Sequence, residues 1–495
     1  MVKERARGRR LIVLLAVLAL IVAACGGGGD EEEGAGSGDD GGGGGEGGEE
    51  VSGSATLLTA FTEPQDLEGV ENLIAAFNEQ YPDAEITHEG SPSFEEQALT
   101  RVEGGNPPEM MFIPQPGLLK DFYDRGAALP MDFLDLEALE GEYVPGLLQA
   151  GTLEDQLVGL PVRLSVKSLV WYRNDVFSEN GYEVPETWED MVTLTEQINS
   201  DMGGEGTSPW CIGIENATAT GWTLTDWVED VMLRLHGGDV YDEWVGHDVT
   251  FTSPEVTEAF QQVADLWFTE GNVLGGQQNI VQTSFSAAPE PMFEDPPACL
   301  LHRQASFIQG SFPEDMEYGT NYDFFYLPPI EAGTGENPML TAGDLLALFD
   351  ANPVTQAFAE FAATAEGQEA WAQAGSMLCG NSNCSPDAYP DDATTKQGEL
   401  LAGASEARFD ASDLMPSQVG AGSFWNQGTQ WVAGEQELEP TLQAIDDAWP
   451  EGACGVGGVG ANCAAGASGA EDGASEAGAD ASEADAAAPS EAVSE

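Results

Sequence analysis

Positively charged side chains are scarce in this sequence, and their clustering is informative. Of 15 lysines and arginines, five precede Cys25, and three of the remaining ten are Arg163, Lys167 and Arg173. Ammonium and guanidinium groups donate hydrogen bonds to hydroxyls or pair with carboxylates. Lys167 therefore has two interpretations: it donates to the hydroxyls of a bound solute, or it holds Asp344 or another carboxylate. The residues alone leave both open.

Carboxylates can also catalyse the hydrolysis of glycosides. This reaction needs two carboxyl groups on opposite sides of a cleft, one of them with a raised pKa. Asp226, Glu229 and Asp230 form an acidic group at helical spacing. Because the chain has 87 aspartates and glutamates, we expect these three on the solvated face of one helix. No Gly-x-Ser-x-Gly elbow accompanies a suitable histidine and aspartate. We therefore expect that the protein is not an enzyme. A secreted glycoside hydrolase is the alternative interpretation.

Cys25 follows a basic segment and a short apolar run. Residues 11–24 are uncharged and about as long as a signal-peptide core, too short to span a bilayer comfortably. The small residues at 22–24 followed by cysteine (VAAC) resemble the bacterial lipobox, in which the cysteine is acylated. We expect residues 1–24 to be a lipoprotein signal peptide and Cys25 to anchor an exported protein to the outer face of the cell membrane. A secreted protein with an incidental cysteine is the alternative.

Both ends of the chain are glycine-rich and acidic. Residues 26–54 contain nine acids and almost no apolar side chain, so 25–54 is expected to be a disordered tether. Residues 464–495 are Ala, Ser, Gly, Glu and Asp with almost no branched residue. We therefore expect 451–495 to form a cysteine loop and a disordered acidic tail.

The net charge of -72 excludes some ligands. Such a field repels nucleic acid and anionic lipid surfaces, so neither is an expected partner. Scarce lysine and dispersed acids are typical of proteins adapted to high salt, where screening relieves self-repulsion. A cationic ligand steered by the acids is the alternative.

Six further cysteines, an even number in an exported chain, predict three disulfides. Two pairs are close in sequence and the third would close a long loop: Cys379 with Cys384, Cys454 with Cys463, and Cys211 with Cys299. Spacing leaves fifteen connectivities open. The four histidines are not paired with one another or with a Cys-x-x-Cys motif, so we expect no zinc site, no other metal and no cofactor.

Apolar periodicity after residue 54 alternates between strand and helix. Strands are predicted at 55–61, 84–88 and 110–113, and helices at 67–77 and 94–102. This βαβαβ order implies a parallel sheet, in which ligands bind beyond the carboxyl ends of the strands. Residues 61–65 and 114–117, with Glu63 and Gln115, are thus expected near a site.

The second part of the chain repeats this mixture. Extended segments at 157–162 and 168–172 interrupt the alternation and predict a crossover between two lobes. Further elements are predicted as helices at 188–198, 222–235 and 254–267, the last capped by Ser253, and as strands at 210–214, 298–302, 322–327 and 340–349. A helix-rich end follows at 353–449.

Several segments, in this order, resemble an extracellular solute-binding protein of an ABC importer, of the maltose and alpha-glucoside type. They are the opening strand and helix, then 159–161 (GLP), 167–172 (KSLVWY), 208–213 (SPWCIG), 301–307 (LHRQASF), 342–344 (AGD), 413–416 (DLMP) and 422–425 (GSFW). The resemblance implies a two-lobed α/β fold of the type II periplasmic-binding-protein kind, with hinge strands. It places lobe 1 at 55–160 and 336–400, lobe 2 at 161–335, and helices 401–450 mainly on lobe 2.

The resemblance also suggests the residues that bind a sugar. A pyranose stacks its apolar face on an aromatic ring and needs hydrogen bonds for its hydroxyls. Trp425 is the first choice for stacking, Trp222 the second and Phe307 the third, although aromatics usually fill cores. Trp171, Trp188, Trp244, Trp267 and Trp371 are assigned to packing. Polar ligand contacts are expected from Glu63, Gln115, Ser165, Lys167, Gln304 and Asp344.

The resemblance thus implies a monomeric lipoprotein that captures a di- or oligosaccharide and delivers it to a permease. A polyamine or an amino acid is the alternative solute. A polyamine would suit acidic walls, and an amino acid would need a base such as Arg303 for its carboxylate.

Overall fold

The computed structural model describes residues 51–143, 147–334, 338–375, 377–403, 407–460 and Cys463. The predicted signal peptide, Cys25 and the tail after Cys463 lie outside the described residues. The predicted tether reaches into them, and its predicted end is wrong. Gly53 and Ser54 already pair with Ala84 and Glu85 as the first residues of a strand. A strand can form here because pairing with the neighbouring strand satisfies the backbone N–H and C=O groups. This pairing does not depend on large apolar side chains.

The first lobe begins with the predicted βαβαβ order. Strand β1 (Gly53–Thr59) pairs in parallel with both β2 (Ala84–Gly90) and β3 (Met110–Ile113). Helices α1 (Pro64–Gln80) and α2 (Phe94–Glu103) make the two connections.

The first helix, α1, forms where its apolar residues recur at helical spacing. Pro64 lies in its first turn, where a missing N–H costs nothing. Val70, Leu73 and Phe77 lie on its buried face, and the helix stops at Tyr81, just before Pro82.

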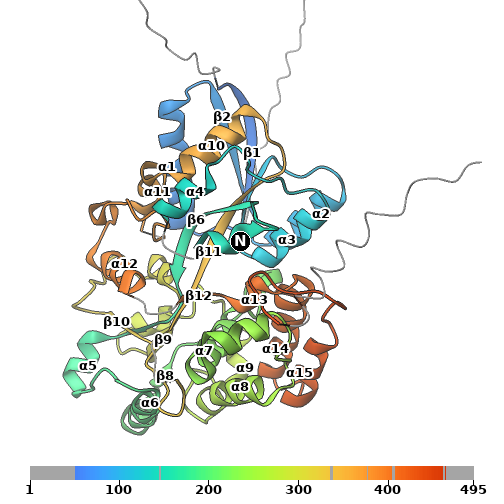
Figure 1. Ribbon diagram of the computed structural model, residues 1–495. Helices are drawn as coiled ribbons and strands as arrows, with labels where there is room; N and C mark the ends of the chain where they lie inside the picture. The colour runs from blue at the N-terminus through green and yellow to red at the C-terminus, as the bar shows by residue number, and fades with distance from the viewer. Residues whose placement is uncertain are drawn as a thin grey trace, which may run out of the picture. The chain divides into compact units, whose positions relative to one another are not determined.

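Two long strands give this sheet its mixed direction. Strands β6 (Gly159–Val166) and β11 (Met339–Leu348) are antiparallel to each other, and β11 is also antiparallel to β3. The sheet is therefore mixed and not purely parallel as the alternation predicted, because β11 enters it from the opposite side. Strand β12 (Ala407–Phe409) pairs with the other end of β11. Figure 1 shows β6 and β11 running from one lobe toward the other.

The second lobe contains a four-stranded sheet in the order β10-β7-β9-β8. These strands are β10 (Asp323–Tyr326), β7 (Leu169–Tyr172), β9 (Cys299–Arg303) and β8 (Ser208–Trp210). Strand β8 is shorter than predicted. The chain turns away after Trp210, and Gly213 lies where a Cβ would be 2.6 Å from the carbonyl oxygen of Thr283.

Helices cover this second sheet. They are α5 (Asn174–Asn180), α6 (Trp188–Met202), α7 (Trp222–Val245), α8 (Pro254–Trp267) and α9 (Gln277–Ile280). Ser253 caps α8 as predicted, because its side chain accepts a hydrogen bond from the Val256 amide. Helix α7 is longer than predicted, with a kink at Gly237, whose φ is 79°.

The remaining elements surround the two sheets. They are α3 (Pro116–Asp124), α4 (Leu136–Glu142), β4 (Thr152–Leu153), β5 (Gln156–Leu157), α10 (Pro353–Ala363), α11 (Ala365–Ala372), α12 (Asp392–Gly403), α13 (Ala411–Leu414), α14 (Trp425–Val432) and α15 (Leu438–Asp446). Helices α13 and α14 pack on α7, and α15 packs on α8. Among the described helices, none is both long and apolar enough to cross a membrane.

Large aromatic side chains fill separate cores. In the first lobe, Phe77, Phe112, Phe358 and Trp371 pack together between α1, β3, α10 and α11. In the second, Trp227 touches the rings of Trp188, Trp210 and Trp267. The tryptophans that the sequence assigned to packing are confirmed as buried: Trp171, Trp188, Trp244, Trp267 and Trp371.

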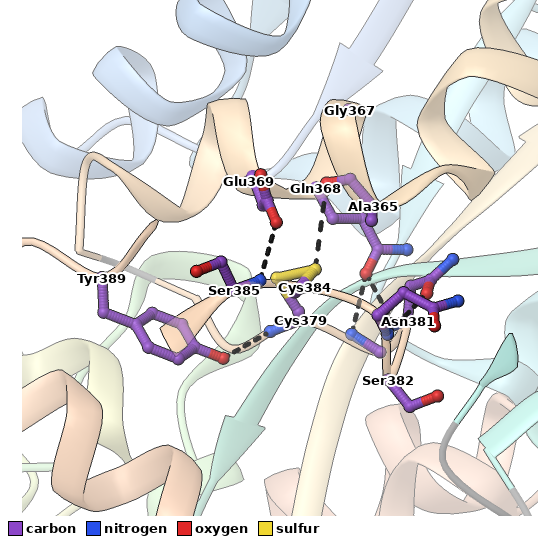
Figure 2. The surroundings of a disulfide bond; sticks show 12 residues. Ala365, Gly367, Gln368, Glu369, Cys379, Asn381, Ser382, Cys384, Ser385 and Tyr389 are labelled. Atoms are coloured by element: carbon purple, nitrogen blue, oxygen red, sulfur yellow. Dashed lines mark hydrogen bonds between the residues drawn. A yellow bond between two sulfur atoms is a disulfide. The ribbon is translucent and has the colours of Figure 1, made fainter. Parts of the chain in front are cut away.

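The six cysteines after Cys25 form three disulfides, Cys211–Cys299, Cys379–Cys384 and Cys454–Cys463. The middle one closes a loop after α11 (Figure 2). Gln368 of α11 accepts hydrogen bonds from the amides of Gly380 and Asn381, at 2.8 and 2.9 Å. Just before the loop, Leu378 pairs with Leu164 of β6. This loop therefore connects a helix of the first lobe to a strand that crosses between the lobes.

Candidate ligand-binding cleft

A cleft lies where the two lobes meet the long strands. Its empty space, measured out to the open mouth, is about 1020 Å³. The lining residues come from the ends of β1 and β3, from β6 and β11, and from the second lobe. The cleft therefore lies beyond the ends of these strands, where the sequence predicted a site. Eight of the nine residues proposed as ligand contacts line it: Glu63, Gln115, Ser165, Lys167, Trp222, Phe307, Asp344 and Trp425.

Gln304 is the ninth, and it does not line the cleft. It follows the last residue of β9 and is 2% exposed. Its side-chain oxygen accepts a hydrogen bond from the amide of Ala305 at 2.8 Å, and its carbonyl accepts one from Trp171 Nε1 at 3.2 Å. The side chain therefore stabilises the turn after β9.

Aromatic rings form one wall of the cleft. Trp222 lies at the start of α7, partly exposed, with its ring 5.1 Å from that of Phe285 and 6.0 Å from that of Phe307. Phe61, two residues after β1, also lines the cleft. The residues 61–65 were expected near a site, whereas nothing in the sequence singled out Phe285.

Trp425 is more buried than a stacking platform requires. It begins α14, is 3% exposed, and donates from Nε1 to Ser412 Oγ at 3.4 Å. It still lines the cleft. Only a small part of its ring is therefore open to a ligand in this conformation, and Trp222 offers the larger face.

Arg163 of β6 is held at the back of the cleft by two carboxylates. Its Nη1 lies 2.8 Å from Asp344 Oδ2, and its Nη2 lies 2.9 Å from Asp66 Oδ1. The guanidinium is also sandwiched between two rings, 5.0 Å from the centroid of Phe61 and 5.4 Å from that of Phe307. Asp344, expected to contact the ligand, is thus buried and already paired with Arg163.

Lys167, between β6 and β7, holds carboxylates. Its Nζ lies 2.7 Å from Asp226 Oδ1 and also bonds Asp410. Burial alone would lower the pKa of Lys167, but the charges of Asp226 and Asp410 raise it above its usual value. Of the two sequence interpretations, carboxylate binding is the one seen, and the partner is not Asp344. The ammonium also lies 5.1 Å from the ring centroid of Trp222.

The acids of α7 are wholly buried, so the expectation of a solvated face is wrong. Asp226, Glu229 and Asp230 are all 0% exposed. The first half of α7 is covered on every side by other elements, so it has no solvent face. Asp230 accepts hydrogen bonds from Ser168 at 2.8 Å and Arg234 at 2.6 Å, and Arg303 also bonds it.

Charges in this cluster shift its pKa values in opposite directions. Burial would raise the pKa of Asp230, but Arg234 and Arg303 lower it below its usual range. Burial raises the pKa of Asp226 to about 7, against the opposing charge of Lys167. Burial and the nearby charge of Asp410 raise the pKa of Glu229 well above its usual value. Asp226 and Glu229 therefore keep their protons more readily than exposed acids do. These protons reduce the excess of negative charge in the cluster, whose three buried cations are Lys167, Arg234 and Arg303.

Three of these carboxyls lie close enough to bind one cation. Oxygens of Asp226, Glu229 and Asp410 lie within 4.8 Å of one another. The ammonium of Lys167 bonds two of them and supplies a positive charge at this place. The helical spacing of Asp226 and Glu229 was the sequence signal for this group. Nothing in the sequence pointed to Asp410, which lies 184 positions after Asp226.

The sequence of this chain matches a known protein family. The profile of a family described as bacterial extracellular solute-binding protein matches residues 62–369. The chain belongs to this family. The matched range contains Trp222 and Phe307, whereas Asp413 and Trp425 lie after it.

Two characterised relatives are similar over most of this solute-binding protein. The osmoprotective compounds-binding protein GgtB of Synechocystis sp. is 37% identical over 384 residues, covering 77% of this chain and 89% of GgtB. The alpha-glucosides-binding periplasmic protein AglE of Rhizobium meliloti is 37% identical over 375 residues, covering 74% and 80%.

Solved structures share its fold. A chitin oligosaccharide binding protein superposes with a TM-score of 0.68 at 17% identity, covering 80% of this chain and 98% of that one. Maltose-bound MalE3 of T. maritima gives a TM-score of 0.64 at 18% identity, with the same coverage. The predicted type II periplasmic-binding-protein fold is confirmed.

Proposed function

We propose that this solute-binding protein captures a di- or oligosaccharide of the alpha-glucoside class in the cleft and delivers it to the permease of an ABC importer. The aromatic wall is the observation that carries the proposal. The partly exposed rings of Trp222, Phe285 and Phe307 lie together in the cleft, which polar Glu63 and Gln115 also line. Such a site suits a ring with one apolar face and a rim of hydroxyls. AglE, a relative by sequence, is named for alpha-glucosides.

The cations of the cleft favour a neutral solute. Among the described residues that line it, the two bases are Arg163 and Lys167, and each already pairs with two carboxylates. Arg303, the base considered for an amino-acid carboxylate, is buried against Asp230 and Asp226. A carboxylate or phosphate on the solute would therefore find no free positive charge on the described walls.

The hydrolase alternative loses its candidate acids. Asp226, Glu229 and Asp230 are fully buried, and none of the three lines the cleft. Asp226 and Asp230 pair with Lys167, Arg234 and Arg303, and Glu229 accepts a hydrogen bond from the amide of Ser412. We propose that capture and release complete the function, with no bond broken.

The proposal includes the membrane. The lipobox-like segment before Cys25 supports lipid anchoring of a monomer on the outer face of the cell membrane, and the acidic composition supports a high-salt habitat. Anchoring would raise the effective concentration of the loaded protein beside its permease.

A thermal-shift screen in high salt tests the solute class. Maltose, trehalose, sucrose, polyamines and amino acids are added to the purified protein, because a ligand that binds only the folded state raises its melting temperature. We expect at least one sugar to raise the midpoint. A shift with an amine and none with any sugar would contradict the proposal, and release of reducing ends from a glycan panel would restore the hydrolase.

A further inference from the structure

One buried hydrogen-bond acceptor without a partner, and the carboxyl of one further buried residue, face the cleft. The amide of Gln115, 5% exposed, has a buried Oε1 that accepts no hydrogen bond. The carboxyl of Asp413, 6% exposed, also accepts none from the described residues. Both line the cleft. A buried acceptor left unpaired is unfavourable, so a hydrogen-bond donor from outside the protein would be stabilising at Gln115.

The backbone brings these two residues together. Gln115 directly precedes α3, and Asp413 lies in α13. At Gly117, in the first turn of α3, a Cβ would lie 1.8 Å from the carbonyl oxygen of Met415 and 3.2 Å from that of Asp413. Only glycine permits this approach, and Ser417 also bonds Asp121 of α3. The contact holds α13 against the start of α3.

Glu95 of α2 orients the amide. Gln115 Nε2 donates to Glu95 Oε1 at 3.1 Å, which leaves the amide oxygen of Gln115 for another donor. Asp413 is positioned by its own amide, which donates to Asp410 Oδ1 at 3.2 Å. Burial and the charges of Asp410, Asp226 and Glu95 raise the pKa of Asp413, against the opposing charge of Lys167. A hydrogen bond donated by a ligand would stabilise the carboxylate form of Asp413.

We infer that Gln115 and Asp413 form an acceptor subsite that binds adjacent hydroxyl groups at one end of the sugar, with Glu95 as a positioning residue. The inference rests on the proposed function and adds its specificity. The subsite recognises hydroxyls as donors, so it rejects sugars in which those hydroxyls are removed or methylated. A carboxylate or phosphate at this end would face acceptors alone.

Calorimetric titration with monodeoxy analogues of the best-bound disaccharide tests the subsite. We expect Asp413→Asn to weaken binding of the parent sugar about 10-fold or more, and Gln115→Leu up to about 10-fold. The deoxy analogue that binds poorly to the wild type should lose little further affinity in these variants, because the same hydrogen bond is already absent. Glu95→Gln should reduce discrimination against that analogue.

Glu96→Gln is the matched control, since Glu96 is exposed on the same helix as Glu95. It should bind the parent sugar and the analogues as the wild type does. Unchanged affinity in both Asp413→Asn and Gln115→Leu would overturn the subsite, as would losses that simply add to those of the deoxy analogues. If Asp413→Asn fails to fold, Gln115→Leu decides alone. A wild type that binds no sugar would instead refute the proposed function.

Discussion

The ammonium of Lys167 lies 2.7 Å from Asp226 Oδ1, although the two residues are 59 positions apart. Through its second bond, to Asp410, the same ammonium also reaches the segment that begins α13. One buried charge thus joins the link between the two sheets, the first half of α7 and the C-terminal region. The ion pairs of Lys167 lie next to the aromatic wall, because the same ammonium also contacts the ring of Trp222.

Removing Lys167 should destabilise the protein strongly. Lys167→Met leaves Asp226 and Asp410 buried without their shared cation, which typically costs about 3–5 kcal/mol. Urea unfolding measures the change. Lys120→Met is the control, because Lys120 forms an exposed pair with Asp124 on one helix, and its loss should cost less than about 0.5 kcal/mol. Equal effects of the two variants would refute a structural role for the buried ammonium.

Asp226 should make stability fall as the pH rises. Burial raises its pKa to about 7 in the folded protein, against about 4 in the unfolded chain. The folded state therefore binds more protons between these values, and the free energy of unfolding decreases with pH by up to about 1.4 kcal/mol per unit for one group. We expect Asp226→Asn to flatten this dependence between about pH 5 and 7.

Urea unfolding at fixed high salt measures these slopes. Asp265→Asn is the control, since Asp265 is exposed on α8, where it accepts a hydrogen bond from Gln261. Its slope should match that of the wild type. A wild-type slope in Asp226→Asn as well would contradict the raised pKa.

Trp222 should contribute more to sugar binding than Trp425. Trp222→Ala removes a partly exposed ring from the aromatic wall, and a loss of about 1–2 kcal/mol, roughly 5- to 30-fold in affinity, is expected. Trp425→Ala should weaken binding less and stability more, because Trp425 is 3% exposed. Calorimetric titration and unfolding measure both. Trp449→Ala is the control, since Trp449 stacks on His247 and does not line the cleft. The reverse order of affinities would restore Trp425 as the main platform.

The disulfides should differ in their effect on stability. Cys211–Cys299 closes a loop with a separation of 88 residues, and Cys379–Cys384 one of 5. Loop-closure entropy predicts losses of about 4–5 and about 2 kcal/mol when each pair is replaced by serine. The hydrogen bonds that the loop amides donate to Gln368 in Figure 2 remain after the second replacement, so the short loop stays attached to α11. A larger loss at the short loop would contradict this order.

Local pattern was enough to predict the first strands and helices. The apolar stripe of α1 and the proline after Tyr81 set that helix within a few residues, and the strand-end rule placed Gln115 at the cleft. These features depend on neighbours in sequence. The extended segments at 157–162 and 168–172 interrupt this pattern and predicted the crossover between lobes, where β6 and β7 lie.

Partners far apart in sequence decided what local pattern missed. Asp226, Glu229 and Asp230 have the spacing of a solvated helix face, but Lys167 and Arg303, far from α7 in the sequence, pair with the two aspartates inside the protein. The same holds for Asp413, whose exposure to the cleft depends on contact between α13 and α3. No sequence window contains both members of these pairs.

The central claim is that one sugar binds between residues of the two lobes. Calorimetric titration of the best-stabilising alpha-glucoside into the wild type and the double variant Gln115→Leu/Trp222→Ala tests it most directly, because one residue comes from each wall. We predict one sugar per chain for the wild type and a loss of affinity larger than either single change for the double variant. Wild-type affinity in the double variant, or no sugar bound by the wild type, would contradict the claim.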